Sequence, residues 1–296
     1  DMENEGWSYP KFFLSSDGNP FGISYNKLWV MDKKNNYRIS KVGEIPLETG
    51  GISDKIIHQN PNDKEDYKEL TTLTIGAPVG DKGSAVMIAK DKILFIGGQQ
   101  KGVGYAASNK TILIDISDSF NPKIIEKESM HYPRAFADAT ILPTGDVFVN
   151  GGTAVYQGAY DDTYFSNFTP EIYKSNDNIW KKMSKTNFRR NYHSTSLLLP
   201  DGRIFVAGGD AWNAQFFYPP YLFTKDNKGK TILAKRPEIK ELKKTIINRK
   251  EQIMQVDDSD DVEKISLIST GSTTHAQASE LKYLFLIFKK ISKNKI

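Results

Sequence analysis

Three segments of the chain share one pattern, in which an apolar stretch, a turn and a second apolar stretch lead into a Gly-Gly pair. The pairs begin at Gly97, Gly151 and Gly208, in steps of 54 and 57 residues. Two of the turns read Leu-Pro-Thr-Gly and Leu-Pro-Asp-Gly, and proline and glycine at these positions favour a tight hairpin. Each segment therefore predicts two antiparallel strands, and this repeat constrains the fold more than any other feature of the sequence.

A repeat of about 50 residues is the spacing of kelch-type β-propellers, in which each repeat forms one sheet, called a blade. A fourth, more degenerate copy runs from Tyr9 to Asp32, with its turn at Asp17 and Gly18. Because closed propellers have about four to eight blades, four loosely spaced units indicate part of a larger ring. We expect an all-β fold with a partial kelch-type β-propeller of about four blades over residues 1–230.

The pattern changes from about residue 231. Short alternating stretches at 244–256 and 262–270 predict strands, and the small polar residues of 271–280 favour a loop. We expect residues 231–296 to begin an Ig-like (early set) β-sandwich. Because such a sandwich needs roughly 100 residues, this one would be incomplete.

The composition excludes several classes of function. The 40 basic residues are interleaved with 36 acidic ones, so nucleic-acid binding is not implied, and the lysines from Lys282 onward are interpreted as a solvated tail. The chain has no cysteine, which excludes disulfides, thiolate metal sites and a cysteine nucleophile. The apolar stretch Tyr283–Phe288 is far shorter than the roughly 20 residues that cross a bilayer, and the first residues show no targeting signal. No membrane span is expected.

A tyrosine and a histidine stand side by side at the beginning of the last repeat. When the last two repeats are aligned on their Leu-Pro-x-Gly turns, Ala135 falls opposite Tyr192 and Phe136 falls opposite His193. The repeat can thus be built without this pair, which is a local addition. Neighbouring residues of a regular strand point to opposite faces, so the two rings can share a ligand only if the strand is not yet regular there.

Two imidazoles and a phenolate suit a tetragonal Cu(II) site, and Tyr192, His193 and His275 are the candidate ligands. Ordinary packing remains an alternative for Tyr192 and His193, and an exposed loop position remains one for His275. His58 is interpreted as a solvated loop residue, and His131 as a packing or capping residue.

Other motifs carry less. Ser194 lies in no Gly-x-Ser-x-Gly elbow, which disfavours a hydrolase. The acidic pairs and triplets at 161–162 and 258–261 are interpreted as solvated turns. The glycosylation triplet at 167–169 is of a kind that is common by chance.

At the Tyr-His pair the chain resembles the copper radical oxidases, the family of galactose oxidase and glyoxal oxidase. The resemblance spans about residues 7–277. It is carried by YHS with LPDG at 192–202, FTPEIY at 168–173, FFYPPYLF at 216–223, KRPEI at 235–239 and ISLISTGSTTHA at 265–276.

The resemblance implies that His193 and His275 bind copper and that Tyr192 is an axial ligand and the general base. The family oxidises a primary alcohol or an aldehyde, carbohydrates included, with O₂ to give H₂O₂. Copper takes one electron, and a tyrosyl radical takes the other. The resemblance also implies a secreted or cell-envelope protein.

The chain departs from the family in two ways. The radical tyrosine of the family is linked to a cysteine, so the Tyr-Cys cofactor is not possible in this chain. The sequence after His275 also departs from the family pattern. We therefore expect a C-terminal fragment of such an oxidase, with little or no activity alone. The competing interpretation is a non-catalytic kelch propeller that binds a glycan or a protein through loops such as the aromatic-rich 153–168.

Overall fold

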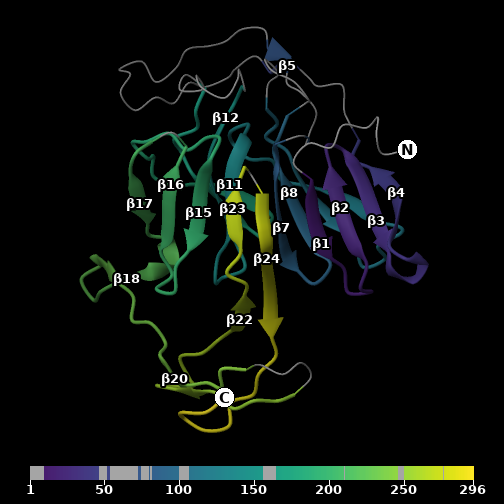
Figure 1. Cartoon of the computed structure of the whole chain (residues 1–296). Coiled ribbons are helices and arrows are strands. Elements are labelled where there is room, and N and C mark those ends of the chain that lie inside the picture. Colours follow the sequence, from purple (N-terminus) through teal and green to yellow (C-terminus); the bar gives the residue numbers. More distant parts are fainter. Residues whose placement is uncertain are drawn as a thin grey trace. The chain divides into compact units, whose positions relative to one another are not determined.

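The computed structural model describes residues 10–46, 52–53, 73–74, 80, 82–99, 107–155, 165–209, 211–245, 250–275 and 277–296. Within these ranges the regular elements are β-strands and two short 3₁₀ turns, η2 (Lys33–Asn35) and η3 (Pro220–Leu222) (Figure 1). The all-β fold expected from the sequence is therefore confirmed.

The chain divides into two compact units. The first comprises Asp1–Phe217 together with Ile268–Tyr283, and the second comprises Tyr218–Leu267 together with Leu284–Ile296. A segment close to the C-terminus thus belongs with the first unit, and it contains His275. The predicted division into a propeller over 1–230 and a sandwich over 231–296 stays a prediction.

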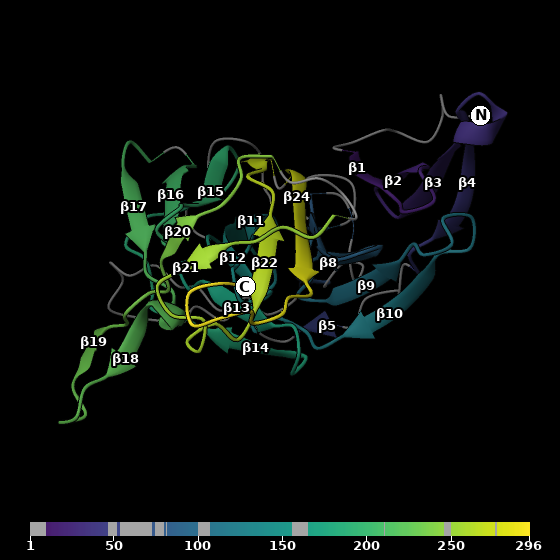
Figure 2. The same cartoon turned by 90° about the horizontal axis from the view of Figure 1, so that it is seen from below.

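Four sheets, each built on antiparallel neighbouring strands, follow the four predicted repeats in order, and the second is extended to seven strands by later segments of the chain (Figures 1 and 2). The first sheet is formed by β1 (Lys11–Leu14), β2 (Pro20–Ser24), β3 (Lys27–Asp32) and β4 (Arg38–Glu44). The second contains β7 (Ser84–Ala89), β8 (Lys92–Ile96), β9 (Thr111–Asp115) and β10 (Lys123–Lys127). The third contains β11 (Ala135–Ile141), β12 (Val147–Thr153), β13 (Glu171–Lys174) and β14 (Ile179–Lys182). The fourth has three strands, β15 (Ser194–Leu198), β16 (Ile204–Gly208) and β17 (Ala214–Phe217). A separate pair joins β5 (Ile52–Ser53) to β6 (Leu73–Thr74).

The Gly-Gly pairs at 97–98 and 151–152 contact the start of the next repeat. Gly151 has a positive φ of 67°, and a Cβ there would overlap the Arg190 carbonyl. The amide of Gly152 donates to that same carbonyl at 2.7 Å. One sheet earlier, the amide of Gly98 donates to the Arg134 carbonyl at 2.7 Å. The repeated glycines therefore allow the backbone of the following repeat to approach closely.

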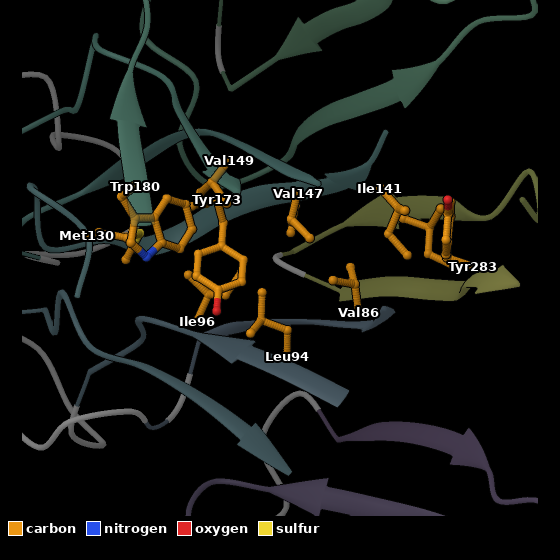
Figure 3. Packing of buried hydrophobic residues seen from close by; sticks show 13 residues of the cluster. Val86, Leu94, Ile96, Met130, Ile141, Val147, Val149, Tyr173, Trp180 and Tyr283 are labelled. Atoms are coloured by element: carbon orange, nitrogen blue, oxygen red, sulfur yellow. The ribbon is translucent and has the colours of Figure 1, made fainter. Parts of the chain in front are cut away.

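The largest apolar core lies between the second and third sheets. All seven residues of β11 and all seven of β12 are buried. Figure 3 shows Trp180, Tyr173 and Met130 at one end of this cluster and Val86 and Tyr283 at the other. Each fully buried apolar side chain stabilises the fold by about 1.5–3 kcal/mol. The core therefore holds the third sheet, which precedes the Tyr-His pair, firmly in place.

The segment around His275 differs from the expected loop. The strands β23 (Ser272–Thr274) and β24 (Gln277–Leu286) form an antiparallel hairpin, with His275 in its turn. Strand β24 also pairs in parallel with β7, through Gln277 opposite Ala85 and Lys282 opposite Met87 (Figure 1). The prediction of a loop at 271–280 is therefore wrong. Small polar residues on strands suggested a loop, but pairing with a distant strand satisfies their backbone groups.

The second unit has short strands. They are β18 (Phe223–Lys225), β19 (Thr231–Leu233), β20 (Ile239–Glu241) and β21 (Gln255–Val256), and β22 (Ile265–Ile268) leads back toward the first unit. Its small core gathers Val256, Val262 and Ile296. The strands expected at 244–256 and 262–270 are present only as β21 and β22, with 246–249 outside the described residues. The Ig-like assignment stays a prediction.

Over the described part of the chain, no helix has the length and apolar character to span a membrane.

Candidate metal centre

Tyr192 and His193 lie in a turn directly before β15, which begins at Ser194. His193 has a φ of 65°, in the left-handed region that residues other than glycine rarely adopt. The strand is therefore not yet regular at this point, which is the condition under which the two rings can share a ligand. The ring centroids of Tyr192 and His193 are 3.8 Å apart, so the neighbouring side chains lie together instead of on opposite faces.

The left-handed backbone recurs at the same position of the other repeats. Ala137 pairs with Gly151 and Ser194 pairs with Gly208, which places Phe136 and His193 at equivalent positions. Phe136 has a φ of 58°, and Lys82, which holds this position in the second sheet, has a φ of 61°. The backbone conformation thus belongs to the repeat, and only the side chain differs. The fold presents one side chain at this point in each of the three sheets.

His275 reaches the same place from the turn of the β23–β24 hairpin. Its ring centroid lies 4.7 Å from that of His193 and 4.9 Å from that of Tyr192, with nearly perpendicular rings. His275 also has a positive φ, of 53°. The fold therefore brings together the three candidate ligands, although 82 positions separate the two histidines.

Burial, and secondly the charge of His193, hold the pKa of His275 below its usual value. The neutral imidazole is the form that binds a metal ion. His193 is exposed, and Tyr192 and His275 are partly buried. A ligand arriving from solvent can therefore reach the three rings.

An aromatic wall stands beside the three rings. The Phe136 and Tyr192 rings pack in a T-shaped arrangement with centroids 4.8 Å apart, and Lys82 Nζ lies 5.5 Å from the Phe136 centroid. Phe136 is buried with Ala107 and Ala135. This wall restricts the orientation of the Tyr192 ring.

A buried polar pair joins β15, which begins directly after His193, to β11. Ser194 Oγ donates to Asp138 Oδ2 at 2.6 Å. Burial raises the pKa of Asp138 to about 7, against the opposing effects of the Ser194 hydrogen bond and the charge of Arg190. Burial likewise lowers the pKa of Arg190, and Asp138 opposes that shift. Sequence reasoning missed Asp138, although it is the one charged residue in the otherwise uncharged stretch 135–141.

The remaining predicted residues lie elsewhere. His131 Nδ1 lies 2.6 Å from Glu171 Oε2, and the His131 amide donates to the same oxygen, so this histidine is paired with a buried carboxyl group. Asn167 is buried and donates to the Pro133 carbonyl at 2.7 Å, which leaves it poorly placed for glycosylation. The amide of Asp260 donates to Asp258 Oδ1 at 3.0 Å, within the expected acidic turn.

His58, the acidic pair at 161–162 and most of the aromatic insert lie outside the described residues. Among the residues that the structure describes, no group of three or more His, Cys, Asp or Glu side chains could hold a metal ion. The candidate ligand set therefore depends on the phenol of Tyr192 as its third member.

Comparisons with known proteins identify galactose oxidases, glyoxal oxidases or related aldehyde oxidases as similar to this chain. The family model described as glyoxal oxidase N-terminus matches residues 82–226. A galactose oxidase from Gibberella zeae is 32% identical over 211 residues, covering 67% of this chain and 30% of that protein. The aldehyde oxidase GLOX1 from Arabidopsis thaliana is 22% identical over 311 residues, covering 97% of this chain and 48% of that protein. The chain thus spans between about a third and a half of these relatives.

A solved structure is similar over nearly the whole chain. A fungal alcohol oxidase in complex with copper superposes with a TM-score of 0.66 and 22% identity, covering 98% of this chain and 68% of that one. At this identity the similarity establishes the fold alone. It supports the sheet arrangement described above.

Proposed function

The chain belongs to the copper radical oxidase family of galactose oxidase and glyoxal oxidase, and from this premise we propose that Tyr192, His193 and His275 bind one Cu(II) ion. The family reaction to which this site would contribute is the oxidation of a primary alcohol or an aldehyde by O₂. An alcohol RCH₂OH and O₂ give RCHO and H₂O₂, whereas an aldehyde and O₂ consume one water and give a carboxylic acid and H₂O₂. Family kinship also favours a secreted or cell-envelope location.

The convergence of three rings from two distant segments is the observation that carries this proposal. The residues fit the metal chemically, because imidazole nitrogens and a phenolate oxygen suit Cu(II) and disfavour Mg²⁺ or Ca²⁺. Burial lowers the pKa of His275, which favours the neutral imidazole that a metal ion binds. A site made only of carboxylates would favour a different metal.

Each side chain then has a defined role. The imidazoles of His193 and His275 hold the ion, and Tyr192 takes the hydroxyl proton of the substrate. Bound copper would supply an acceptor for one electron and would lower the pKa of the Tyr192 phenol. The Phe136 ring keeps the phenol from turning away from the site.

The same chemistry needs a second one-electron acceptor. In the family this is a tyrosine linked to a cysteine, and this chain contains no cysteine. We therefore expect no turnover by this chain alone, measured as peroxide release from glyoxal and from galactose. Robust peroxide production by the purified chain would contradict this expectation.

Equilibrium titration with Cu(II) tests the proposed site. We expect one equivalent to bind tightly, and His193→Ala and His275→Ala each to abolish that binding. His131→Ala is the matched control, because it removes a histidine that is paired with Glu171 away from the three rings. Binding that survives in both single variants would show that copper lies elsewhere.

The alternative of a non-catalytic module that binds a glycan or a protein has no specific support among the described residues. Its candidate surface, the aromatic insert, lies mostly outside them. If the wild-type chain binds no stoichiometric Cu(II), this alternative becomes the favoured interpretation.

A further inference from the structure

The first strands of neighbouring sheets contact one another at equivalent positions. The residue just before each Gly-Gly pair is opposite Ser84 in the second sheet and opposite Asp138 in the third. Ser84 and Asp138 are therefore equivalent. By the same register, Ala137 of β11 is equivalent to Ser194 of β15, since each pairs with the first glycine.

The junction of β7 with β11 and the junction of β11 with β15 both use this pair of positions. At the junction of β7 with β11, Ser84 Oγ donates to the Ala137 carbonyl. At the junction of β11 with β15, the contact is instead the hydrogen bond from Ser194 Oγ to Asp138 Oδ2, at 2.6 Å. At this position of the β7–β11 junction the polar contact is thus made by a serine hydroxyl and a backbone carbonyl, without a carboxyl group.

The acidic group at the second junction is therefore more than the fold requires. Asp138 is 1% exposed, and its other oxygen, Oδ1, has no hydrogen-bond partner among the described residues. Burying a carboxyl group with one unsatisfied oxygen destabilises a protein, so the presence of this group calls for an explanation. The structure places this group at the one junction whose next strand carries the Tyr-His pair.

The consequence for His193 follows from its backbone. Ser194 is the next residue in the chain, its amide donates to the Asn191 carbonyl at 2.9 Å, and its hydroxyl is held by Asp138. Ser194 thus ends the turn that contains Tyr192 and His193 with two contacts. Its amide bonds the start of the turn, and its hydroxyl bonds the neighbouring strand β11. The left-handed φ of His193 is common to the repeats, as at Phe136 and Lys82, so what the Ser194–Asp138 contact adds is a fixed position for the end of this turn relative to β11.

We propose that Asp138 is a positioning residue of the candidate copper site, acting through Ser194 to fix the turn that aims Tyr192 and His193. This inference rests on the proposed function. Partners that orient metal ligands from outside the ligand set typically change metal affinity by about 10- to 100-fold when they are removed. Asp138 would be such a partner, with a hydroxyl and a peptide bond between it and the imidazole.

The test compares four variants of the full chain. Asp138→Ala and Ser194→Ala remove the hydrogen bond from either side, and Asp138→Asn keeps an acceptor for Ser194. Ser84→Ala removes the equivalent bond at the other junction, where no ligand follows, and is the matched control. Two quantities are measured, namely the Cu(II) dissociation constant and the His193 ring signals in the NMR spectrum of the metal-free chain.

We expect Asp138→Ala and Ser194→Ala to weaken Cu(II) binding by about 10-fold and to move the His193 signals. Asp138→Asn should restore most of the affinity, and Ser84→Ala should change neither quantity. Near-UV circular dichroism identifies variants that have lost the fold, and the two alanine variants provide independent routes to the same contact.

Two results would overturn the inference. One is a Cu(II) affinity within twofold of wild type and unmoved His193 signals in both alanine variants. The other is an equal loss in Asp138→Asn and Asp138→Ala, which would assign the effect to charge instead of position. If the wild-type chain binds no copper, the proposed function fails, whereas the NMR signals still decide whether Asp138 positions His193.

Discussion

Replacing the buried carboxyl group at position 138 should remove a specific pH dependence of stability. Burial raises the pKa of Asp138 to about 7 in the folded chain, whereas an unfolded aspartate titrates near pH 3.9. Between these values the folded chain holds a proton that the unfolded chain has released. The free energy of unfolding therefore falls as the pH rises.

The magnitude follows from the two pKa values. The loss is absent below about pH 4 and complete only above pH 7. Integrated from pH 5 to pH 7, it amounts to about 2 kcal/mol. Asp138→Asn has no ionisable group at this position. Between pH 5 and pH 7 the free energy of unfolding of the wild type should therefore fall by about 2 kcal/mol relative to that of Asp138→Asn.

Urea denaturation of both proteins at pH 5, 6 and 7 measures this difference. Asp118→Asn is the control, because Asp118 is exposed and hydrogen bonds from Asn121 and Phe120 lower its pKa. That substitution should leave the pH dependence between 5 and 7 unchanged. A wild-type minus Asp138→Asn difference that stays constant within about 0.5 kcal/mol would show that Asp138 is not a buried, proton-holding group.

Two further substitutions test the packing around the site. Gly151→Ala should destabilise the chain by more than about 2 kcal/mol, because the new Cβ overlaps the Arg190 carbonyl and the backbone is left-handed. The control Gly229→Ala, also at positive φ but with open space around it, should cost about half as much, and equal losses of the two variants in urea denaturation would refute the close approach. Trp180→Ala should lower the free energy of unfolding by about 3–5 kcal/mol, because Trp180 is buried in the largest core and donates to the Glu128 carbonyl. A loss below about 1 kcal/mol in urea denaturation would mean that this end of the core is loosely packed.

The repeats could be predicted because their signals are local. Gly-Gly pairs, Leu-Pro-x-Gly turns and alternating apolar residues each act within a few positions, and the four sheets follow them in order. The irregular backbone at Tyr192 and His193 was also predictable, since two neighbouring side chains needed to share one face. The left-handed conformation common to Lys82, Phe136 and His193 was not, because sequence spacing does not report φ.

Long-range pairing marks the limit of the local signals. The parallel pairing of β24 with β7 joins segments about 190 positions apart, and nothing in 271–280 indicates its partner. Asp138 was visible as a charge within an apolar stretch, but its partner Ser194 lies 56 positions later. The proposed copper ligands could be named because a resemblance supplied their pairing, which periodicity alone does not provide.

Paramagnetic broadening by Cu(II) tests most directly whether the three rings form one site. The chain has four histidines, so their ring signals can be assigned by single substitutions. With one equivalent of Cu(II), we expect the signals of His193 and His275 to disappear together while that of His131 persists. Loss of only one of the two, or equal broadening of His131, would contradict a shared copper ion.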